Sequence, residues 1–187
     1  MSRWWSFRTG LVAAFVLQAA LVAWLIVDRA LLLARGQEVR LAVVPIDPRD
    51  LLRGDYVVLS SAISQLDSGK LEGEDTFALN DTIYVSLRKN GETWEAAALH
   101  HAAPAGGTFL KGVVTDTRSG NLCAGECVYR ADYDIEKFFV PEGTGRDLEK
   151  LRNDQRLTVD VALGSGGRAA LKRLMVDGQP RFEEKLF

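Results

Sequence analysis

An uncharged apolar segment near the beginning of the chain limits what the remainder can fold into. Residues Thr9–Val27 read TGLVAAFVLQAALVAWLIV and contain no charged side chain. As an α-helix they span about 28 Å at about 1.5 Å per residue, close to the hydrocarbon thickness of a bilayer, about 30 Å. Tryptophan favours the membrane–water boundary, and tryptophans stand near both ends of the segment: Trp4, Trp5 and Trp24. The segment therefore predicts a transmembrane helix.

A cleaved signal peptide is the alternative interpretation of this segment. Signal peptides have a shorter apolar core, which is followed by a cleavage site of small residues. In this chain Asp28 and Arg29 stand where that site would lie. The sequence therefore favours an uncleaved signal anchor.

Charge alone does not fix the orientation of the anchor, because basic residues flank both of its ends: Arg3, Arg8, Arg29, Arg35 and Arg40. A long C-terminal domain can cross a membrane regardless of its charge, whereas a short basic N-terminus is more easily retained. We expect a cytoplasmic N-terminus (1–8), an anchor with its juxtamembrane segment (9–35), and an extracytoplasmic domain (36–187).

The domain after the anchor is acidic and long enough for a single core. Residues 36–187 hold all but four of the 23 Lys and Arg residues and all but one of the 25 Asp and Glu residues. Without a basic patch to follow phosphates, the domain is poorly suited to nucleic acid. We expect no nucleic-acid partner.

Alternation of apolar and polar residues dominates this domain and predicts strands. The predicted strands are 38–46, 55–63, 82–89, 92–100, 107–116, 127–133, 135–140, 156–163 and 168–176. Asn90-Gly91 predicts a type I′ hairpin turn, and the GSGG sequence at 164–167 predicts a flexible turn. Leu148 and Leu151, with charges between them, predict a short surface helix within 143–154. The pattern is typical of a mainly β domain, an antiparallel barrel or sandwich, with one N-terminal transmembrane helix.

The two cysteines of the chain, Cys123 and Cys127, lie close together. Outside the cytoplasm such a pair predicts a disulfide, which would stabilise the fold by about 2 kcal/mol. Free thiols are one alternative. The other is a zinc site completed by His100 and His101, although this cysteine spacing is only loosely diagnostic of zinc. We expect the disulfide, no metal and no cofactor.

Charged residues crowd the start of the predicted strand 55–63, in the segment DPRDLLRGDYVVL. This segment resembles the signature of the GDYXXLXY family of bacterial membrane-anchored proteins. Gly54, Asp55, Tyr56 and Leu59 fit the signature, whereas Ser61 stands where the signature has its final Tyr. A second block, YDIEKFFVPEGTGRDLE at 133–149, also resembles this family.

The resemblance implies a single-pass protein of the bacterial inner (cytoplasmic) membrane. Its N-terminus would face the cytoplasm and its C-terminal domain would be periplasmic or extracellular. The resemblance also implies a multi-pass membrane-protein partner, and it assigns no biochemical role.

Two interpretations of the charged segment stay open. In the structural one, Pro48 and Gly54 shape a turn, and Asp55 accepts backbone N–H groups at the start of the strand. In the binding one, Arg49 and Arg53 project from one face of a helical turn and grip a carboxylate or phosphate. The candidate binding residues are Asp47, Arg49, Asp50, Arg53, Gly54, Asp55 and Tyr56, with Glu142 from the second block.

An enzymatic interpretation is also available, because a polar loop, then GD, then a β-branched strand loosely resembles the nucleophile region of signal peptidases. The position of their serine is Ile46 here, and no lysine is evidently placed to deprotonate Ser60 or Ser61. We therefore expect a non-catalytic, membrane-anchored envelope domain that binds a membrane-protein partner or an anionic ligand. An envelope hydrolase or peptidase distantly like signal peptidase is the alternative.

Overall fold

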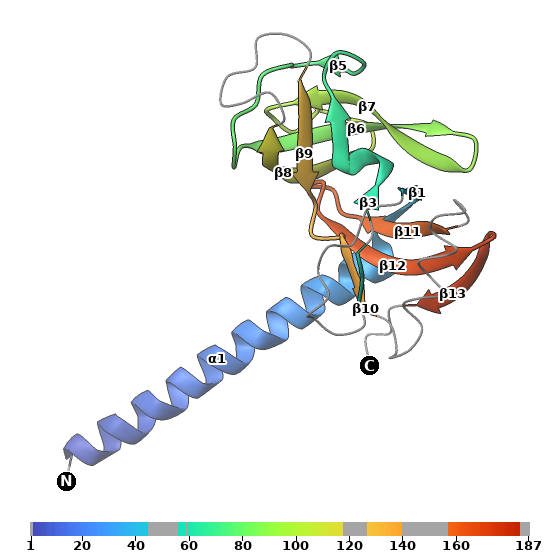
Figure 1. The fold of residues 1–187 in the computed structure, drawn as a ribbon. Coiled ribbons are helices and arrows are strands. Elements are labelled where there is room, and N and C mark those ends of the chain that lie inside the picture. The colour runs from blue at the N-terminus through green and yellow to red at the C-terminus, as the bar shows by residue number, and fades with distance from the viewer. Residues whose placement is uncertain (1, 45–55, 59, 118–126, 140–156, 184–187) are drawn as a thin grey trace.

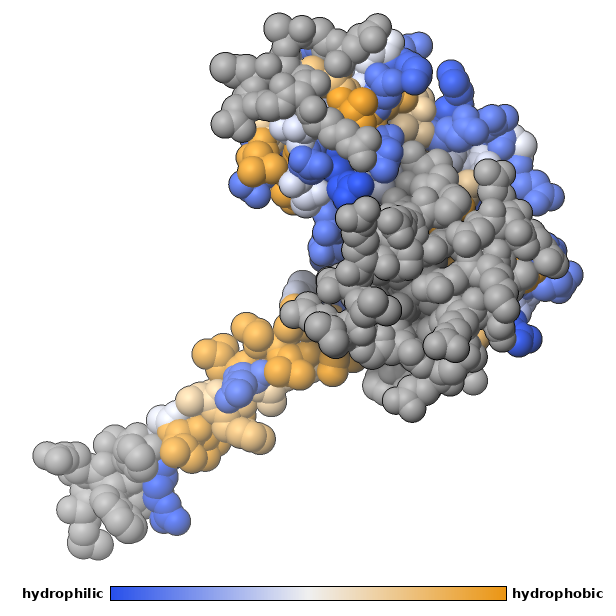
Figure 2. Space-filling view, in the orientation of Figure 1, coloured by the Kyte–Doolittle hydropathy of each residue, from blue (hydrophilic) through white to orange (hydrophobic). Residues whose placement is uncertain are grey.

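The computed structural model describes residues 2–44, 56–58, 60–117, 127–139 and 157–183. Within these residues one α-helix, α1 (Ser2–Arg35), projects as a long rod from a domain of strands (Figure 1). Its Arg8–Arg35 portion is long and apolar enough to cross a membrane. Apolar side chains are uncovered along the rod (Figure 2), and Phe15 and Trp24 are 70% and 71% exposed. The prediction of an apolar N-terminal helix is confirmed.

Strands make up the domain that follows α1, so the mainly β prediction is also confirmed. In chain order they are β1 (Gln37–Val44), β2 (Tyr56–Val58), β3 (Ser60–Ser61), β4 (Gln65–Asp67), β5 (Glu72–Gly73), β6 (Thr82–Asn90), β7 (Thr93–His100), β8 (Phe109–Thr117), β9 (Val128–Asp132), β10 (Lys137–Phe139), β11 (Leu157–Leu163), β12 (Ala169–Val176) and β13 (Gln179–Glu183). A 3₁₀ turn, η1 (Ala62–Ser64), joins β3 to β4.

Eleven strands form one sheet in the order β13-β12-β11-β1-β7-β6-β8-β9-β4, with β3 beside β1 and β5 beside β7. Most neighbours are antiparallel, but β1 and β5 each run parallel to β7. The sheet is therefore mainly antiparallel, as expected, and two of its pairings are parallel. The reason is that β7 forms a hairpin with β6 and also pairs with strands from earlier in the chain.

The pairings of this sheet form a closed ring. The segment from β3 to β4 pairs at its start with the end of β1, through Val43↔Ser61 and Val44↔Ser60. At its end the segment pairs with β9, through Leu66↔Tyr129 and its neighbours. Together with the chain of neighbours β1-β7-β6-β8-β9, this ring is the topology of a barrel, which removes exposed strand edges. Strands β11, β12 and β13 continue the sheet away from β1.

One apolar cluster fills the interior. Its largest fully buried side chains are Tyr129, Leu41, Ile63, Leu66, Ile83, Leu99, Leu110, Leu157 and Leu174. They come from most of the strands and from η1, so the core depends on the whole ring and not on one hairpin.

The end of α1 is packed onto this domain, with only Gly36 between the helix and β1. Leu33 is buried in a small second cluster with Ala162 of β11 and Ala170 of β12. The two alanines lie opposite each other in the β11–β12 register, and they leave room for the leucine. The helix is therefore fixed to the sheet without a linker.

Polar contacts strengthen this junction on the turn between β11 and β12. The guanidinium of Arg168 donates two hydrogen bonds to the carboxylate of Asp28, at 2.8 and 3.0 Å. Arg29 donates to the carbonyl oxygen of Ala169 at 3.4 Å. Residues 28 and 29, which replace a cleavage site in the sequence, thus contact the β domain directly.

The β6–β7 hairpin is confirmed, but its turn is not the predicted one. Asn90 pairs with Thr93, so the two loop residues are Gly91 and Glu92 and not Asn90 and Gly91. Gly91 has a φ of 61° and Glu92 has no positive φ, which fits a type II′ turn with glycine first. The predicted surface helix at 143–154 lies outside the described residues.

Candidate functional site

Most of the predicted binding residues lie outside the part of the chain that the structure describes: Asp47, Arg49, Asp50, Arg53, Gly54, Asp55 and Glu142. Tyr56 is described through its backbone, as the first residue of β2. The roles of these residues therefore stay predictions. The described residues around them show how the two sequence blocks are brought together.

Strands from the two blocks pair with each other. β2 belongs to the first block, β10 belongs to the second, and together they form a separate antiparallel ribbon. The register places Tyr56 opposite Phe139 and Val58 opposite Lys137. The chain reaches Tyr56 from residues 45–55 and leaves Phe139 toward residues 140–156, so both segments join the ribbon at the same end.

A second contact joins the second block to η1, which follows the first block in the chain. Tyr133, the first residue of the second block, donates a hydrogen bond from its hydroxyl to the carbonyl oxygen of Ile63 in η1, at 2.8 Å. Its ring is buried against Gly112, where a Cβ would stand 2.7 Å from the ring. Burial raises the pKa of this phenol above its ordinary value. Tyr133 is therefore a neutral structural link.

A tight turn connects β9 to β10 and carries three acidic residues. Glu136 accepts hydrogen bonds from the backbone N–H groups of Tyr133 and Ile135, at 2.8 and 2.9 Å. Asp132 accepts one from the N–H of Asp134 at 2.9 Å. Burial, followed by a hydrogen bond with Asp132, raises the pKa of Glu136 to about 7.

We call β2, η1, the Tyr133–Glu136 turn and β10 the motif unit. It takes one part from each block and rests on the barrel through Tyr133. The sequence singled out both blocks, but not Tyr133 or Glu136 as individual residues. Other acids, basic residues and a second tyrosine also stand in the segment 127–140, so no local signal sets these two residues apart.

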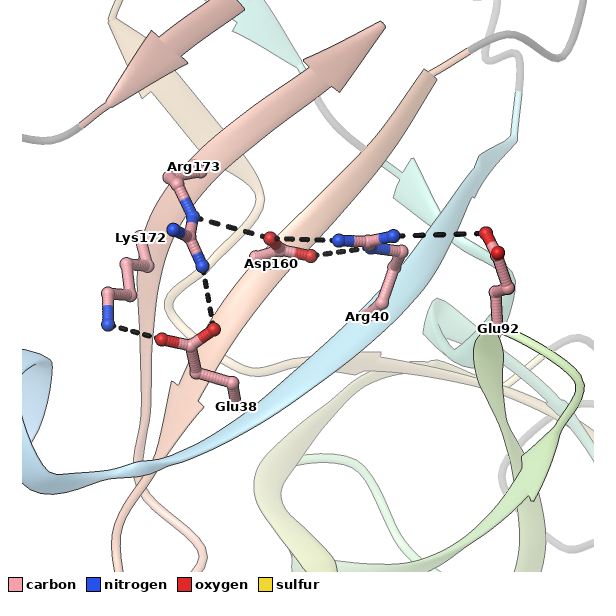
Figure 3. A network of polar contacts seen from close by, with 6 residues as sticks. All are labelled: Glu38, Arg40, Glu92, Asp160, Lys172 and Arg173. Carbon is pink, nitrogen blue, oxygen red and sulfur yellow. Dashed lines mark hydrogen bonds and ion pairs between the residues drawn. The ribbon is translucent and has the colours of Figure 1, made fainter. Parts of the chain in front are cut away.

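A second polar cluster lies on β1, β11 and β12 (Figure 3). Asp160, whose side chain is 4% exposed, stands between Arg40 on one neighbouring strand and Arg173 on the other. The Arg40 Nε donates to the Asp160 carboxylate at 2.7 Å, and the Arg173 Nε lies 3.3 Å from it. Lys172 and Arg173 both contact Glu38. Arg40 and Arg173 are cross-strand neighbours of Asp160, whereas Glu38 reaches Lys172 and Arg173 across the intervening strand β11.

The charges of this cluster balance, which indicates a structural role. Its three cations are Arg40, Lys172 and Arg173, and its three anions are Glu38, Glu92 and Asp160. The hydrogen bond from Lys172 lowers the pKa of Glu38, and the hydrogen bond to Asp160 raises the pKa of Arg40. A buried carboxylate that is held by two guanidinium groups offers no unpaired charge to a ligand.

The two histidines considered for zinc have other partners. His100 Nε2 lies 2.9 Å from the hydroxyl oxygen of Ser86 on β6. The ring of His101 stacks on Phe77 with 4.3 Å between ring centroids, and its backbone N–H donates to Glu74. Within the described residues no group of three or more metal-ligating side chains comes together.

The predicted disulfide joins a described residue to one outside the described ranges. Cys127 is buried, and its backbone N–H donates to the hydroxyl of Ser68 at 3.0 Å. Cys123 lies within the segment 118–126, which the structure does not describe. The pairing therefore stays a prediction.

Comparison with known proteins points to one family. The family model described as "GDYXXLXY protein" matches residues 18–174 of this chain. The match begins within α1 and ends in β12, so it includes the helix–sheet junction and both sequence blocks. No curated protein and no solved structure matches the chain.

Proposed function

Because the chain belongs to the GDYXXLXY family, we propose that it is a non-catalytic envelope protein that binds a partner through the motif unit and the residues next to it. The observation that carries this proposal is the pairing of β2 with β10. It joins the two blocks into one ribbon, and both predicted binding segments are connected to the same end of that ribbon. If the charged residues only shaped a turn, the two segments would not need to join the ribbon at the same end.

We infer a single-pass anchor for this domain. The support is the apolar, uncovered helix α1 and its direct passage into β1. On this proposal the N-terminus stays in the cytoplasm, the helix spans the bacterial inner membrane, and residues 36–187 lie in the periplasm or outside the cell. A reporter that is active only outside the cytoplasm, fused after Phe187, should give a signal. Its absence would reverse the orientation.

Two features limit the class of partner: the proposed anchor, and the direct passage from α1 into β1 with only Gly36 between them. A domain whose helix is packed onto its sheet cannot reach far from the membrane surface. The proposed partner is therefore a multi-pass membrane protein, and an anionic group on it would suit Arg49 and Arg53. No nucleic acid and no cofactor is part of the proposal.

Recovery of the full-length protein with its partners from cross-linked membranes tests this function. Arg49→Ala and Arg53→Ala should each reduce recovery of the membrane partner while the protein stays folded and inserted. Arg88→Ala is a matched control, because Arg88 is an exposed arginine on β6 outside the motif unit. Equal recovery for all three variants would refute binding by the charged segment.

The Cys123–Cys127 disulfide belongs to the same proposal, because an extracytoplasmic compartment favours it. Thiol labelling of the unfolded protein should find no reactive cysteine before reduction and two after it. Two labels before reduction would contradict both the disulfide and the oxidising compartment.

Hydrolysis is the second candidate function, and one observation favours it. The Ser86 hydroxyl and the His100 imidazole are within hydrogen-bond distance, as a nucleophile and its base must be. Among the described residues no carboxylate orients the other ring nitrogen of His100, so this candidate ranks second. A serine-reactive phosphonate probe should label the full-length protein, and Ser86→Ala should abolish the label. An unlabelled parent protein would remove hydrolysis at Ser86.

A further inference from the structure

The contacts of the β11–β12 turn with α1 indicate the level of this turn along the helix. The apolar run of α1 ends at Val27. Directly after it, the carboxylate of Asp28 accepts two hydrogen bonds from Arg168, and Arg29 donates to the carbonyl oxygen of Ala169. The turn 164–168 therefore extends back along the helix to the point where the apolar run stops.

In a transmembrane α1 this point lies at the boundary of the hydrocarbon core. The polar layer beyond the core is about 5–8 Å thick on each side of a bilayer. At about 1.5 Å per residue, Arg29 lies about 3 Å beyond Val27 and Leu32 about 8 Å beyond it. A Cβ on Gly164 would stand 3.1 Å from Leu32 Cδ1. The turn therefore lies at the level of the lipid headgroups, and Gly164, at its base, lies at their outer edge.

A cavity of about 180 Å³ lies beside the base of this turn. Gln37, Thr108 and Phe109 line it, together with Gly164 and Ser165 of the turn. The amide of Gln37, the first residue of β1, and the hydroxyl of Thr108 hydrogen-bond each other, at 2.9 and 3.3 Å. Because Gln37 and Ser165 are both exposed, the cavity is open to its surroundings at the outer edge of the headgroup layer.

The polar side chains that line the cavity are uncharged. An amide and a hydroxyl each contain a donor and an acceptor, so they can bind hydroxyl groups of a ligand in either direction. A cation stands nearer the membrane, because Arg168 lies beside Asp28 and its side chain is 64% exposed. Asp28 takes one N–H from each Nη atom of Arg168. The remaining N–H groups of the guanidinium can donate to a phosphate.

We propose that the cavity binds the headgroup of an anionic phospholipid that carries hydroxyl groups, as phosphatidylglycerol does. The hydroxyl groups lie against Gln37, Thr108 and Ser165, and the phosphate lies closer to the membrane, beside Arg168. This order, phosphate first and hydroxyl groups beyond it, is the order in which such a headgroup leaves the bilayer. The inference rests on the transmembrane anchor of the proposed function, and it adds a lipid as a ligand of the domain.

Depth measurement in nanodiscs tests the level of the turn in the full-length protein. A fluorophore is attached at Gly166→Cys, where nothing lies within 4 Å of a Cβ. The matched control is Gln179→Cys at the start of β13. It lies farther from the membrane, because the first residue of β12 contacts Arg29 and the second packs on Leu33, which is further along α1.

Spin-labelled lipid headgroups should quench most of the fluorescence at residue 166 and little of it at residue 179. The parent protein, treated with the same label, measures the contribution of the native cysteines. Equal quenching at the two positions would overturn the proposal.

Lipid titration of the full-length protein in neutral detergent, followed by native mass spectrometry, tests the cavity. The parent should bind phosphatidylglycerol more tightly than phosphatidylcholine, whose headgroup carries no hydroxyl group. Gln37→Ala and Thr108→Val should each weaken the binding of phosphatidylglycerol by about three- to tenfold, the effect of one hydrogen bond. Gln65→Ala, on an exposed position of β4, is the matched control and should bind like the parent. Equal affinity of the parent for both lipids, or unchanged affinity in both cavity variants, would overturn the proposal.

Failure of the anchor gives a different result. A protein without a transmembrane helix would not be recovered with nanodiscs, and that outcome would refute the anchor together with this inference. Loss of the lipid site alone leaves the protein inserted, with no preference between the two lipids.

Discussion

The ring and the hydroxyl of Tyr133 have different roles. The ring fills space beside Gly112, and the hydroxyl satisfies the carbonyl of Ile63, which the turn η1 leaves without a strand partner. Both groups are buried, so neither can exchange its contact for water. The contact between η1 and the start of the second block therefore depends on one side chain, in addition to the β2–β10 pairing.

Replacement of Tyr133 by Phe keeps the ring and removes the hydrogen bond. The buried carbonyl of Ile63 then lacks its donor, which should destabilise the domain by about 1–3 kcal/mol. Tyr84→Phe is the control, because Tyr84 is half-exposed and its ring contact with Phe109 is kept. Denaturant unfolding of both variants measures the difference. Equal stability of Tyr133→Phe and the parent would show that the hydroxyl is dispensable.

Gly112 allows the same ring to lie against β8. A Cβ at this position would stand 2.7 Å from the Tyr133 ring and 2.9 Å from the carbonyl oxygen of Asp132. Gly112→Ala should therefore cost about 1–3 kcal/mol of stability through overpacking. Gly106→Ala should be nearly neutral, since nothing lies within 4 Å of a Cβ there. Thermal melts compare the two, and equal melting temperatures would contradict the close packing.

At the scale of elements, alternation predicted the strands that bury one face. β6, β8 and β9 follow it, with every second residue in the core. The short strands β4 and β5 and the charged strand β13, which contains Pro180, carried too little pattern to be recognised. Local patterns mark a strand only where it is long enough to show a period.

Pairing partners were less predictable than the strands themselves. The parallel contacts of β7 join segments far apart in the chain and leave no local trace in either. Asp160 is a similar case, because its partner Arg40 is distant in sequence. For the candidate site, the family resemblance identified both blocks. Their pairing through β2 and β10 depends on tertiary structure, which the sequence pattern does not contain.

The junction between α1 and β1 is an element in its own right, and Gly36 is its critical residue. A Cβ on Gly36 would stand 2.5 Å from the Leu32 carbonyl oxygen and 3.1 Å from the Leu163 backbone nitrogen. These are backbone atoms that cannot turn aside. Gly36→Ala should therefore destabilise the junction by about 1–3 kcal/mol. Gly166→Ala, in the open β11–β12 turn, should change stability by less than about 0.5 kcal/mol. Denaturant unfolding in detergent measures both, and a neutral Gly36→Ala would contradict a fixed junction.

At the scale of the whole molecule, the helix and the barrel act as one body. Figure 1 shows α1 ending against the strands, and Figure 2 shows its apolar surface stopping where the domain begins. The last turn of the helix is therefore packed on the domain, while apolar side chains along the rest of the helix are exposed. The domain should keep a fixed orientation relative to the anchor.

Two soluble fragments test whether the helix end stabilises the domain. A fragment that begins at Asp28 keeps the packing of Leu33 on Ala162 and Ala170, whereas one that begins at Gly36 loses it. Because Leu33 is only 6% exposed, its burial should make the longer fragment more stable by about 2 kcal/mol. Leu33→Ser in the longer fragment should remove most of this difference, since the ion pair between Asp28 and Arg168 is exposed and screened by solvent. Denaturant unfolding of the three proteins gives the comparison. If the two fragments unfold at the same denaturant concentration, the helix end is only attached to the domain and not part of its core.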